Sequence, residues 1–214
     1  MKRGLLVTVD GLDGTGKSSL IKAFAKSAGL TCLSSINSNE NAHILTLTKM
    51  GKSAKDIHLY ALSCLKRSCT EAEMLMGQGK DVIFDRSVFS SLAYYYAIAK
   101  DNKEKIAFPN YSTYGFIEPD IAIILDLAEN IREERISKRT SPADWIDKKT
   151  FSSASFRDDI RDCFINLKIK NQNLVIVDTG KTPEEILEEV VNLFEKKQFR
   201  RRIPASKMGN LEFS

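Results

Sequence analysis

Short apolar runs alternate along the chain with longer segments in which apolar residues recur at helical spacing. The run from Leu5 to Val9 is apolar and β-branched and stops at Asp10-Gly11, as a buried parallel strand does before a turn. Between Ser18 and Ala28 the apolar residues follow a spacing of three and four, which predicts a helix directly after that turn. The same reasoning predicts further strands at Leu30 to Leu33, Val82 to Asp85, Ile121 to Leu127 and Leu174 to Asp178, and further helices at Ile57 to Met76, Ser90 to Ala99, Glu129 to Arg139, Phe156 to Ile169 and Pro183 to Phe194.

The alternation of strands and helices predicts an α/β fold in which a parallel β-sheet is covered by helices on both faces. The first strand should lie at its centre, and ligands should bind outside the carboxyl ends of the strands. Two polar stretches, Ser34 to Asn41 and Asp101 to Tyr114, interrupt the alternation and are expected to be irregular connections. From residue 198 to residue 214 the chain is basic and loses its periodicity, which predicts a disordered tail after a single domain of residues 1–197.

Composition places the chain among ordinary globular proteins. Its 214 residues are 43% hydrophobic and 28% charged, so one domain with a large core is expected. The net charge is only +4, and part of this excess lies near the C-terminus, which argues against a nucleic-acid partner. The four cysteines show no C-x-x-C spacing and are expected to be free thiols. With no signal peptide and no apolar run of membrane-spanning length, we expect a cytoplasmic protein without a membrane partner.

A glycine-rich loop between the first strand and the first helix carries the strongest chemical signal. The segment from Gly11 to Ser18 reads G-x-x-x-x-G-K-S, and its glycines let backbone N–H groups converge on phosphate oxygens at the start of a helix. Lys17 should reach the transferred phosphate, and the Ser18 hydroxyl should ligate Mg²⁺. The motif therefore predicts ATP and Mg²⁺ as cofactors and a fold of the P-loop nucleoside-triphosphate hydrolase type. The cofactor-binding residues expected in and beside this loop are Gly11, Asp13, Gly14, Thr15, Gly16, Lys17, Ser18 and Ser19.

A carboxylate and a guanidinium stand together at the end of another predicted strand. Asp85 ends an apolar run, where it would lie near the phosphate loop and could hold Mg²⁺ directly or through water. Arg86 follows it and offers a forked donor to phosphate oxygens. We therefore expect Asp85 to be a metal ligand and Arg86 to be catalytic.

The helix predicted to begin at Glu129 carries arginines on one face, just before a segment that could close over the site as a helical lid of about residues 132–155. These arginines are Arg132, Arg135 and Arg139. We expect Arg135 and Arg139 to be catalytic, because such residues neutralise charge on a phosphoryl group during transfer. Arg132 and Lys138 are instead expected on a solvated face, paired with glutamates of the same helix.

Aromatic residues and histidines offer weaker signals. Tyr94 and Tyr95 belong to a run of three tyrosines in a predicted helix, so only one or two of the three can share a face. Both are candidates to flank the base of an acceptor, with core packing as the alternative. His43 and His58 are expected to be surface residues rather than ligands.

These segments together resemble the thymidylate kinase family of nucleoside monophosphate kinases, and the likeness covers the chain up to about Phe194. Val9 to Ser19 is similar to the family's opening strand and phosphate loop. Asp85 to Tyr94 is similar to its D-R-Y-x-x-S-x-x-A-Y segment, with Ser87 in place of the tyrosine. Further likeness lies in the P-D-x-x-x-x-L-D strand at Pro119 to Asp126, the lid stretch at Arg135 to Arg139 and the F-x-x-x-V-R-x-x-Y helix at Phe156 to Phe164.

The resemblance implies that ATP donates its γ-phosphate to the 5′-phosphate of a deoxynucleotide, a small-molecule acceptor, giving a diphosphate and ADP. It places Asp13 at the acceptor's sugar hydroxyl and Arg86 at its phosphate. It also places Thr179 and Lys181 in the loop that touches adenine. Because Thr15 stands where some family members carry an arginine, the lid arginines would have to supply that charge. Whether the chain forms a homodimer is left open.

Two departures from the family pattern concern the acceptor. The family's R-E-P-G-G-T segment is missing after the second strand, and Ser34 to Asn41 stands there without an arginine. Arg67 lies in the helix that should carry an acceptor-contacting arginine, but closer to Asp85 than the family spacing would put it. Arg67 is kept as a candidate substrate-binding residue.

Two other functions stay open. A deoxynucleoside kinase also combines a P-loop, a D/E-R-S segment and lid arginines, and Asp85-Arg86-Ser87 suits it in the third residue. Such an enzyme needs a general base for the 5′-hydroxyl, for which Glu40 is a weak candidate. The other function is a nucleotide-binding P-loop module that phosphorylates no small molecule.

Overall fold

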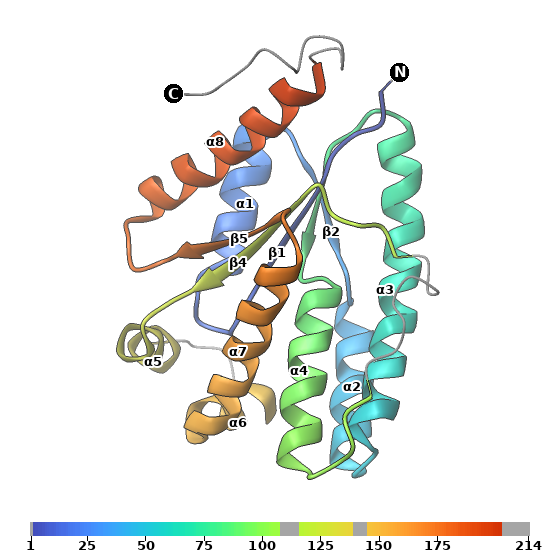
Figure 1. The fold of residues 1–214 in the computed structure, drawn as a ribbon, viewed down its shortest axis with the longest axis vertical. Helices are drawn as coiled ribbons and strands as arrows, with labels where there is room; N and C mark the ends of the chain where they lie inside the picture. The colour runs from blue at the N-terminus through green and yellow to red at the C-terminus, as the bar shows by residue number, and fades with distance from the viewer. Residues whose placement is uncertain (1, 108–115, 139–144, 203–214) are drawn as a thin grey trace.

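The structure is a computed structural model that describes residues 2–107, 116–138 and 145–202 (Figure 1). One parallel sheet has the strand order β2-β3-β1-β4-β5, so the first strand is central, as predicted. The predicted α/β fold is thereby confirmed. The strands are β1 (Leu6–Gly11), β2 (Thr31–Ser34), β3 (Val82–Asp85), β4 (Ile121–Asp126) and β5 (Leu174–Asp178).

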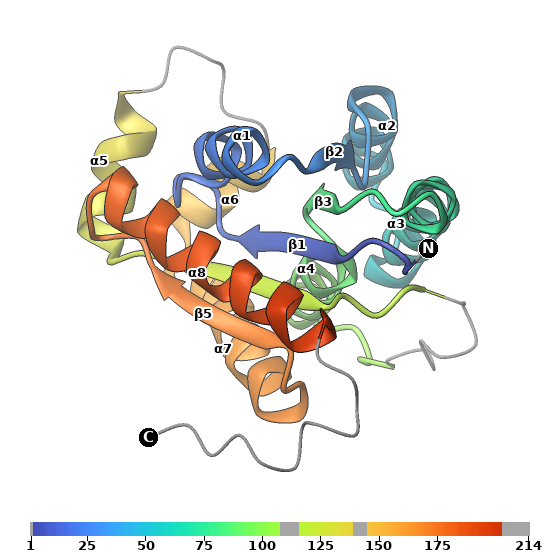
Figure 2. The same cartoon turned by 90° about the horizontal axis from the view of Figure 1, so that it is seen from above.

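Helices cover both faces of the sheet. On one face α1 packs with α8, and on the other face α4 packs with α3 and α7 (Figures 1 and 2). Both views place α2 beside α3, on the far side of the molecule from α5. The helices of the described segments are α1 (Lys17–Ala28), α2 (Ser38–Lys49), α3 (Ala54–Gly77), α4 (Val88–Asp101), α5 (Glu129–Ser137), α6 (Trp145–Ser152), α7 (Ala154–Lys170) and α8 (Pro183–Arg202).

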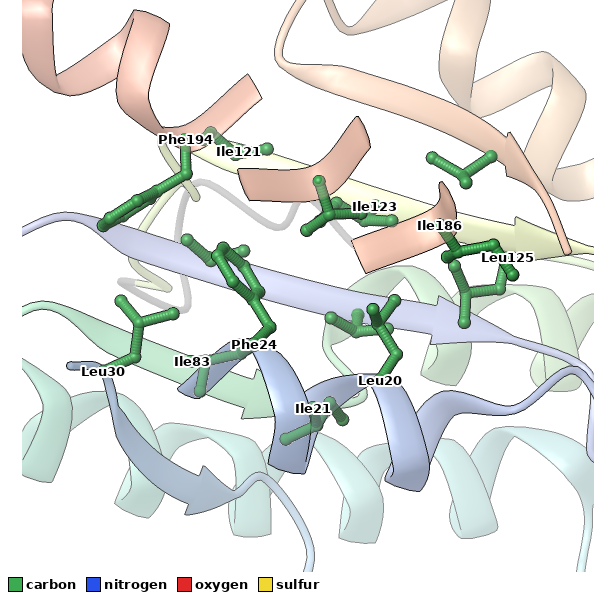
Figure 3. Close-up of a cluster of buried hydrophobic side chains, with 14 of the residues drawn as sticks. Leu20, Ile21, Phe24, Leu30, Ile83, Ile121, Ile123, Leu125, Ile186 and Phe194 are labelled. Carbon is green, nitrogen blue, oxygen red and sulfur yellow. The ribbon is translucent and has the colours of Figure 1, made fainter. Parts of the chain in front are cut away.

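The hydrophobic core lies on both faces of the sheet, because the central strands carry apolar side chains on both faces. Along β4, Ile123 joins the cluster under α1 and α8, whereas the next residue, Ile124, joins the cluster under α4 and α7. Above β1, Phe24 of α1 and Phe194 of α8 meet edge to face with ring centroids 5.5 Å apart (Figure 3). Burial on both faces explains why β1, β3 and β4 read as largely apolar runs, whereas β2 and β5 at the edges are partly exposed.

One helix stands where the sequence pattern predicted an irregular stretch. The stretch around α2 was expected to be irregular, but Asn37 and Glu40 form a capping box in which each side chain accepts from the other's backbone N–H. None of the residues of α2 is buried, so the helix has no apolar stripe to reveal it. Helix α6 occupies part of the segment expected to form a lid.

The last helix is longer than predicted. It continues from Phe194 to Arg202, so residues 198–202, expected to begin a disordered tail, are helical. Polar contacts hold this end: Gln198 donates to Asp81, just before β3, at 2.8 Å, and Arg201 donates to the Arg3 carbonyl at the start of the chain at 3.1 Å. The remainder of the predicted tail, residues 203–214, lies outside the described residues.

None of the helices described is long and apolar enough to cross a membrane.

Candidate active site

Three glycines give the loop between β1 and α1 its shape. Gly11, Gly14 and Gly16 have φ of 134°, 91° and 93°, a region that side chains rarely adopt. A Cβ atom on Gly11 would lie 2.4 Å from the Leu125 carbonyl oxygen, so bulk is excluded as well. Ser18 and Ser19 are exposed in the first turn of α1. The loop has the strand, turn and helix context that the motif requires.

Lys17 lies inside this loop. Its Nζ atom donates to the Leu12 carbonyl at 2.8 Å and lies 3.4 Å from Asp13 Oδ1. The hydroxyl of Thr15 donates to the same Leu12 carbonyl at 2.8 Å. Burial, followed by the nearby Arg86 guanidinium, lowers the pKa of Lys17 to about 8, although Asp13 and Asp85 act in the opposite direction.

Arg86 directly follows β3 and lies beside the phosphate loop. Its backbone has φ of 67°, which is unusual for a residue other than glycine and aims the side chain back at the phosphate loop. Nη2 donates to Asp13 Oδ1 at 2.6 Å and Nη1 to the Gly11 carbonyl at 3.2 Å. Burial opposes the charge, but Asp13 and the other anionic groups around it raise the pKa of Arg86 above its usual value. The guanidinium therefore stays charged.

A buried carboxylate that the sequence analysis did not select supports this arrangement. Asp10, at the end of β1, is fully buried and accepts four hydrogen bonds from two serines. Ser87 donates its N–H and its hydroxyl at 2.8 and 2.7 Å, and Ser90 donates the same two groups at 3.1 and 2.6 Å. Ser87 also caps α4, so Asp10 fixes the start of that helix beside Arg86. The only signal in the sequence was an acid placed directly before the glycine loop.

A pocket of about 340 Å³ opens between the phosphate loop and helices α2, α3 and α4. Asp13, Asp85 and Arg86 lie along its wall, together with Tyr94 and Tyr95, both predicted to contact a substrate. Other wall residues are Asn41, Ile44, Thr48, His58, Ser91 and Ile98. The volume is that of a small-molecule site.

His58 was expected at the surface, and the structure corrects this. It is 3% exposed and stacks on Tyr95 with ring centroids 4.6 Å apart, and its Nδ1 lies 2.9 Å from the Ser91 hydroxyl. The prediction failed because nothing in the sequence around a histidine between apolar helix positions shows that a pocket lies beside it. Burial lowers the pKa of His58 to about 4, although the contact with Ser91 acts against this, so the ring is neutral near pH 7. His43 is exposed, as expected.

The two tyrosines differ in their surroundings. Tyr95 is 3% exposed, and its hydroxyl exchanges hydrogen bonds with the backbone of Ala107, at 3.2 Å to the carbonyl and 3.0 Å from the N–H. Tyr94 lies under the Arg86 guanidinium, with 5.4 Å between Cζ and the ring centroid. Tyr95 thus shapes the wall, and Tyr94 faces the charged end of the pocket.

Arg67 does not belong to the pocket wall. It forms a two-pronged ion pair with Glu40, at 2.9 and 3.0 Å. This pairing, together with the capping contact from Asn37, lowers the pKa of Glu40 against the effect of burial. A carboxylate held in this way is a poor general base, so Glu40 is not suited to the role considered for it.

The lid arginines have different surroundings. Arg132, expected on a solvated face, is completely buried and pairs with Glu129 at 2.6 Å, because it points inward toward the phosphate loop. Lys138 pairs with Glu134 at the surface, as predicted. Arg135 donates to the Thr179 carbonyl at 3.0 Å, and its Nη1 would lie 3.8 Å from a Cβ atom on Gly16.

Arg135 thus bridges the phosphate loop and the loop after β5. In that second loop Thr179 is buried, whereas Lys181 extends to Glu189 of α8 at 2.8 Å. Arg139 lies outside the described residues.

The two predicted metal ligands lie on different elements. Ser18 presents an exposed hydroxyl at the start of α1, and Asp85 lies beside β1 at the end of β3. Among the side chains described, no three His, Cys, Asp or Glu residues gather into a metal site.

The fold and this site define a P-loop phosphotransferase that acts on nucleotides. Residues 9–190 match the sequence model of a family described as "Thymidylate kinase". The chain therefore belongs to the thymidylate kinase family, and it is an ATP-dependent nucleoside monophosphate kinase by class.

Curated relatives have similar lengths. A thymidylate kinase of Fervidobacterium nodosum is 26% identical over 198 residues, covering 89% of this chain and 98% of the relative. One of Carboxydothermus hydrogenoformans is 26% identical over 215 residues, covering 90% and 98%.

Solved structures share the fold. Thymidylate kinase from Candida albicans superposes with a TM-score of 0.70 at 21% identity, over 92% of this chain and 93% of that one. Deoxyadenosine kinase from M. mycoides superposes with a TM-score of 0.69 at 17% identity, over 90% and 100%. The predicted P-loop kinase fold is confirmed.

Proposed function

We propose that the protein transfers the γ-phosphate of ATP to the 5′-phosphate of a deoxynucleoside monophosphate such as dTMP, giving the diphosphate and ADP. The observation that carries this proposal is the position of Asp13 and Arg86. Both lie on the wall of the acceptor pocket, and Asp13 also belongs to the phosphate loop. A donor phosphate in the loop and an acceptor in the pocket would therefore meet at one place.

On the donor side, the roles follow from position and charge. The N–H groups of the glycine loop and the start of α1 would hold the β- and γ-phosphates, and Lys17 would contact the transferred group. Arg135 would stabilise charge from the lid side, helped by Arg139. The loop with Thr179 and Lys181 would lie at the adenine. Mg²⁺, held by Ser18 and Asp85, would neutralise phosphate charge during transfer.

ATP binding is expected to depend on pH through Lys17. The pKa of Lys17 is about 8 without nucleotide, and the phosphates of ATP should raise it. The Kd for ATP should therefore be constant below about pH 8 and rise toward tenfold per pH unit above it, with proton uptake on binding. Calorimetry in two buffers of different ionisation enthalpy measures this uptake. A Kd that stays constant to about pH 9.5 would contradict the expectation, and Lys17→Met should abolish the uptake.

On the acceptor side, Arg86 would hold the acceptor phosphate and Asp13 the sugar hydroxyl. The base would lie between Tyr94 and the wall formed by Tyr95 and His58, which offers stacking surface and no net charge. This apolar, neutral wall suits a planar base.

The charge of the pocket favours a second candidate, a deoxynucleoside kinase. Its wall holds two carboxylate side chains, Asp13 and Asp85, and one guanidinium, Arg86, which is already paired with Asp13. Arg67, which could have added a positive charge, is paired with Glu40. A neutral nucleoside would enter such a pocket more readily than a phosphate dianion, and Asp85 would then be the candidate base for its 5′-hydroxyl.

A substrate panel with MgATP separates these functions. The purified protein is incubated with nucleosides and with nucleoside monophosphates, and products are resolved by anion-exchange chromatography. Diphosphate from dTMP or another monophosphate supports the proposal. Phosphorylation of thymidine but not dTMP would replace it with the deoxynucleoside kinase. Nucleotide binding without any phosphorylated product would indicate a binding module.

A further inference from the structure

Consecutive carbonyl groups of the phosphate loop accept hydrogen bonds from side chains. The Gly11 carbonyl accepts from Arg86, and the Leu12 carbonyl accepts from Thr15 and Lys17. The next carbonyl, that of Asp13, accepts from Arg132 Nη1 at 3.0 Å. A loop binds phosphate through its N–H groups, so its carbonyls must point away from the anion. These side-chain donors keep the carbonyls in that orientation.

Two of these donors must leave when substrates bind. Lys17 and Arg86 are the groups proposed to contact phosphates, so their hydrogen bonds to loop carbonyls would be exchanged for phosphate oxygens. Thr15 would remain on the Leu12 carbonyl. Arg132 has no exposed surface and cannot reach a ligand, so its bond to the Asp13 carbonyl would persist through the reaction.

Arg132 is itself held firmly by the lid. Its Nε and Nη2 donate to the two oxygens of Glu129 at 2.8 and 2.6 Å, and Nη2 also donates to the Thr150 carbonyl of α6 at 3.2 Å. Its stem packs on the loop so closely that a Cβ atom on Gly14 would lie 2.9 Å from Arg132 Cγ. The side chain therefore joins α5 and α6 to the peptide between Asp13 and Gly14.

We infer that Arg132 is a positioning residue for phosphotransfer, which fixes the Asp13–Gly14 peptide so that the loop presents N–H groups and no carbonyl to the phosphates. The inference rests on the proposed use of this loop for ATP. Without Arg132 the Asp13 carbonyl loses the hydrogen bond from Nη1, so the peptide is held less firmly. A carbonyl that turns toward the anion removes one donor and adds repulsion. The Asp13 carboxylate, which pairs with Arg86 and Lys17, would move with it.

Arg157 of α7 provides a matched control. It shares both of the other partners of Arg132, with Nε 3.1 Å from Glu129 Oε1 and Nη1 donating to the Thr150 carbonyl at 2.8 Å. Within the described residues its partners are Glu129 and the Thr150 and Phe151 carbonyls, and it makes no hydrogen bond or ion pair with the phosphate loop. Arg132→Met and Arg157→Met should therefore weaken the same lid cluster, but only the first should disturb the loop.

The test measures binding of phosphates to the phosphate loop separately from binding of adenine and of the acceptor. Inorganic tripolyphosphate with Mg²⁺ is titrated against a fluorescent ATP analogue, and kcat/KM for ATP is measured with the acceptor found by the panel. Because loss of one preorganised donor costs about 10²-fold or more, Arg132→Met should lower kcat/KM by about that factor and weaken tripolyphosphate at least tenfold. Arg157→Met should change either value by less than about threefold, although both variants should melt at similarly reduced temperatures.

A second pair of variants keeps the comparison possible if methionine prevents folding. Arg132→Lys can still donate to the Asp13 carbonyl and should retain at least about tenfold more activity than Arg132→Met, or exceed background if Arg132→Met is insoluble. Equal losses in the Arg132 and Arg157 variants, or native tripolyphosphate affinity in Arg132→Met, would overturn the inference. Native protein that binds tripolyphosphate but phosphorylates no acceptor would overturn the proposed function alone. Native protein that binds neither tripolyphosphate nor the ATP analogue would overturn the proposed function and the inference about Arg132.

Discussion

Lys17→Ala is expected to lower kcat/KM for ATP by about 10³-fold, on the order of 4 kcal/mol of transition-state stabilisation. Lys17 is 7% exposed inside the phosphate loop, where little water can replace its ammonium as a partner for the transferred phosphate. Steady-state kinetics with the acceptor identified by the panel measures the loss.

The fold should survive this change. The Leu12 carbonyl keeps its bond from Thr15, and burial of the Lys17 ammonium near Arg86 already opposes its charge in the folded protein. Circular dichroism and thermal melting should therefore show a folded protein. Lys22→Ala, on the exposed face of α1, is the matched control and should keep native kinetics. Activity retained in Lys17→Ala would remove Lys17 from the proposed mechanism.

Asp10→Ala is expected to lower the free energy of unfolding by about 3–5 kcal/mol. The change leaves the N–H and hydroxyl donors of Ser87 and Ser90 without their buried acceptor, and both N–H groups belong to the start of α4. Activity should fall as well, because Arg86 directly precedes this helix start. Urea denaturation of the substrate-free protein measures the stability, and kinetics on the folded fraction measures the activity.

Asp126→Ala provides the comparison for Asp10. Asp126 also ends a strand, β4, but its side chain is 45% exposed and pairs with Arg161. Its loss should cost less than about 1 kcal/mol. Asp10→Asn, which keeps one acceptor oxygen, should lie between the two. An effect of Asp10→Ala no larger than that of Asp126→Ala would show that the buried hydrogen bonds do not stabilise α4.

The parts of the molecule that could be predicted are those specified by local chemistry. A β-branched run, glycines at fixed spacing and a following apolar helix placed β1, the phosphate loop and α1 correctly. The same local reasoning failed for α2, because a helix without buried residues shows no stripe and only the Asn37 and Glu40 capping box marks its start.

The errors within the site concern what a side chain meets in three dimensions. Arg132 follows a polar helix pattern, and nothing in that pattern shows that the phosphate loop passes beneath it. His58 lies between residues typical of any amphipathic helix, and its burial depends on Tyr95 of a different helix. Charged and polar residues with long-range partners therefore need the tertiary structure to be assigned.

The way in which α2 is attached has a consequence for how substrate preference can change. This helix supplies Asn41, Ile44 and Thr48 to the pocket wall, yet it buries no residue, and the Glu40–Arg67 ion pair joins it to α3. Under the proposed function, substitutions along α2 would alter which acceptor fits with little cost to folding, whereas the phosphate loop is fixed by buried contacts. Acceptor preference could then change while the use of ATP is retained.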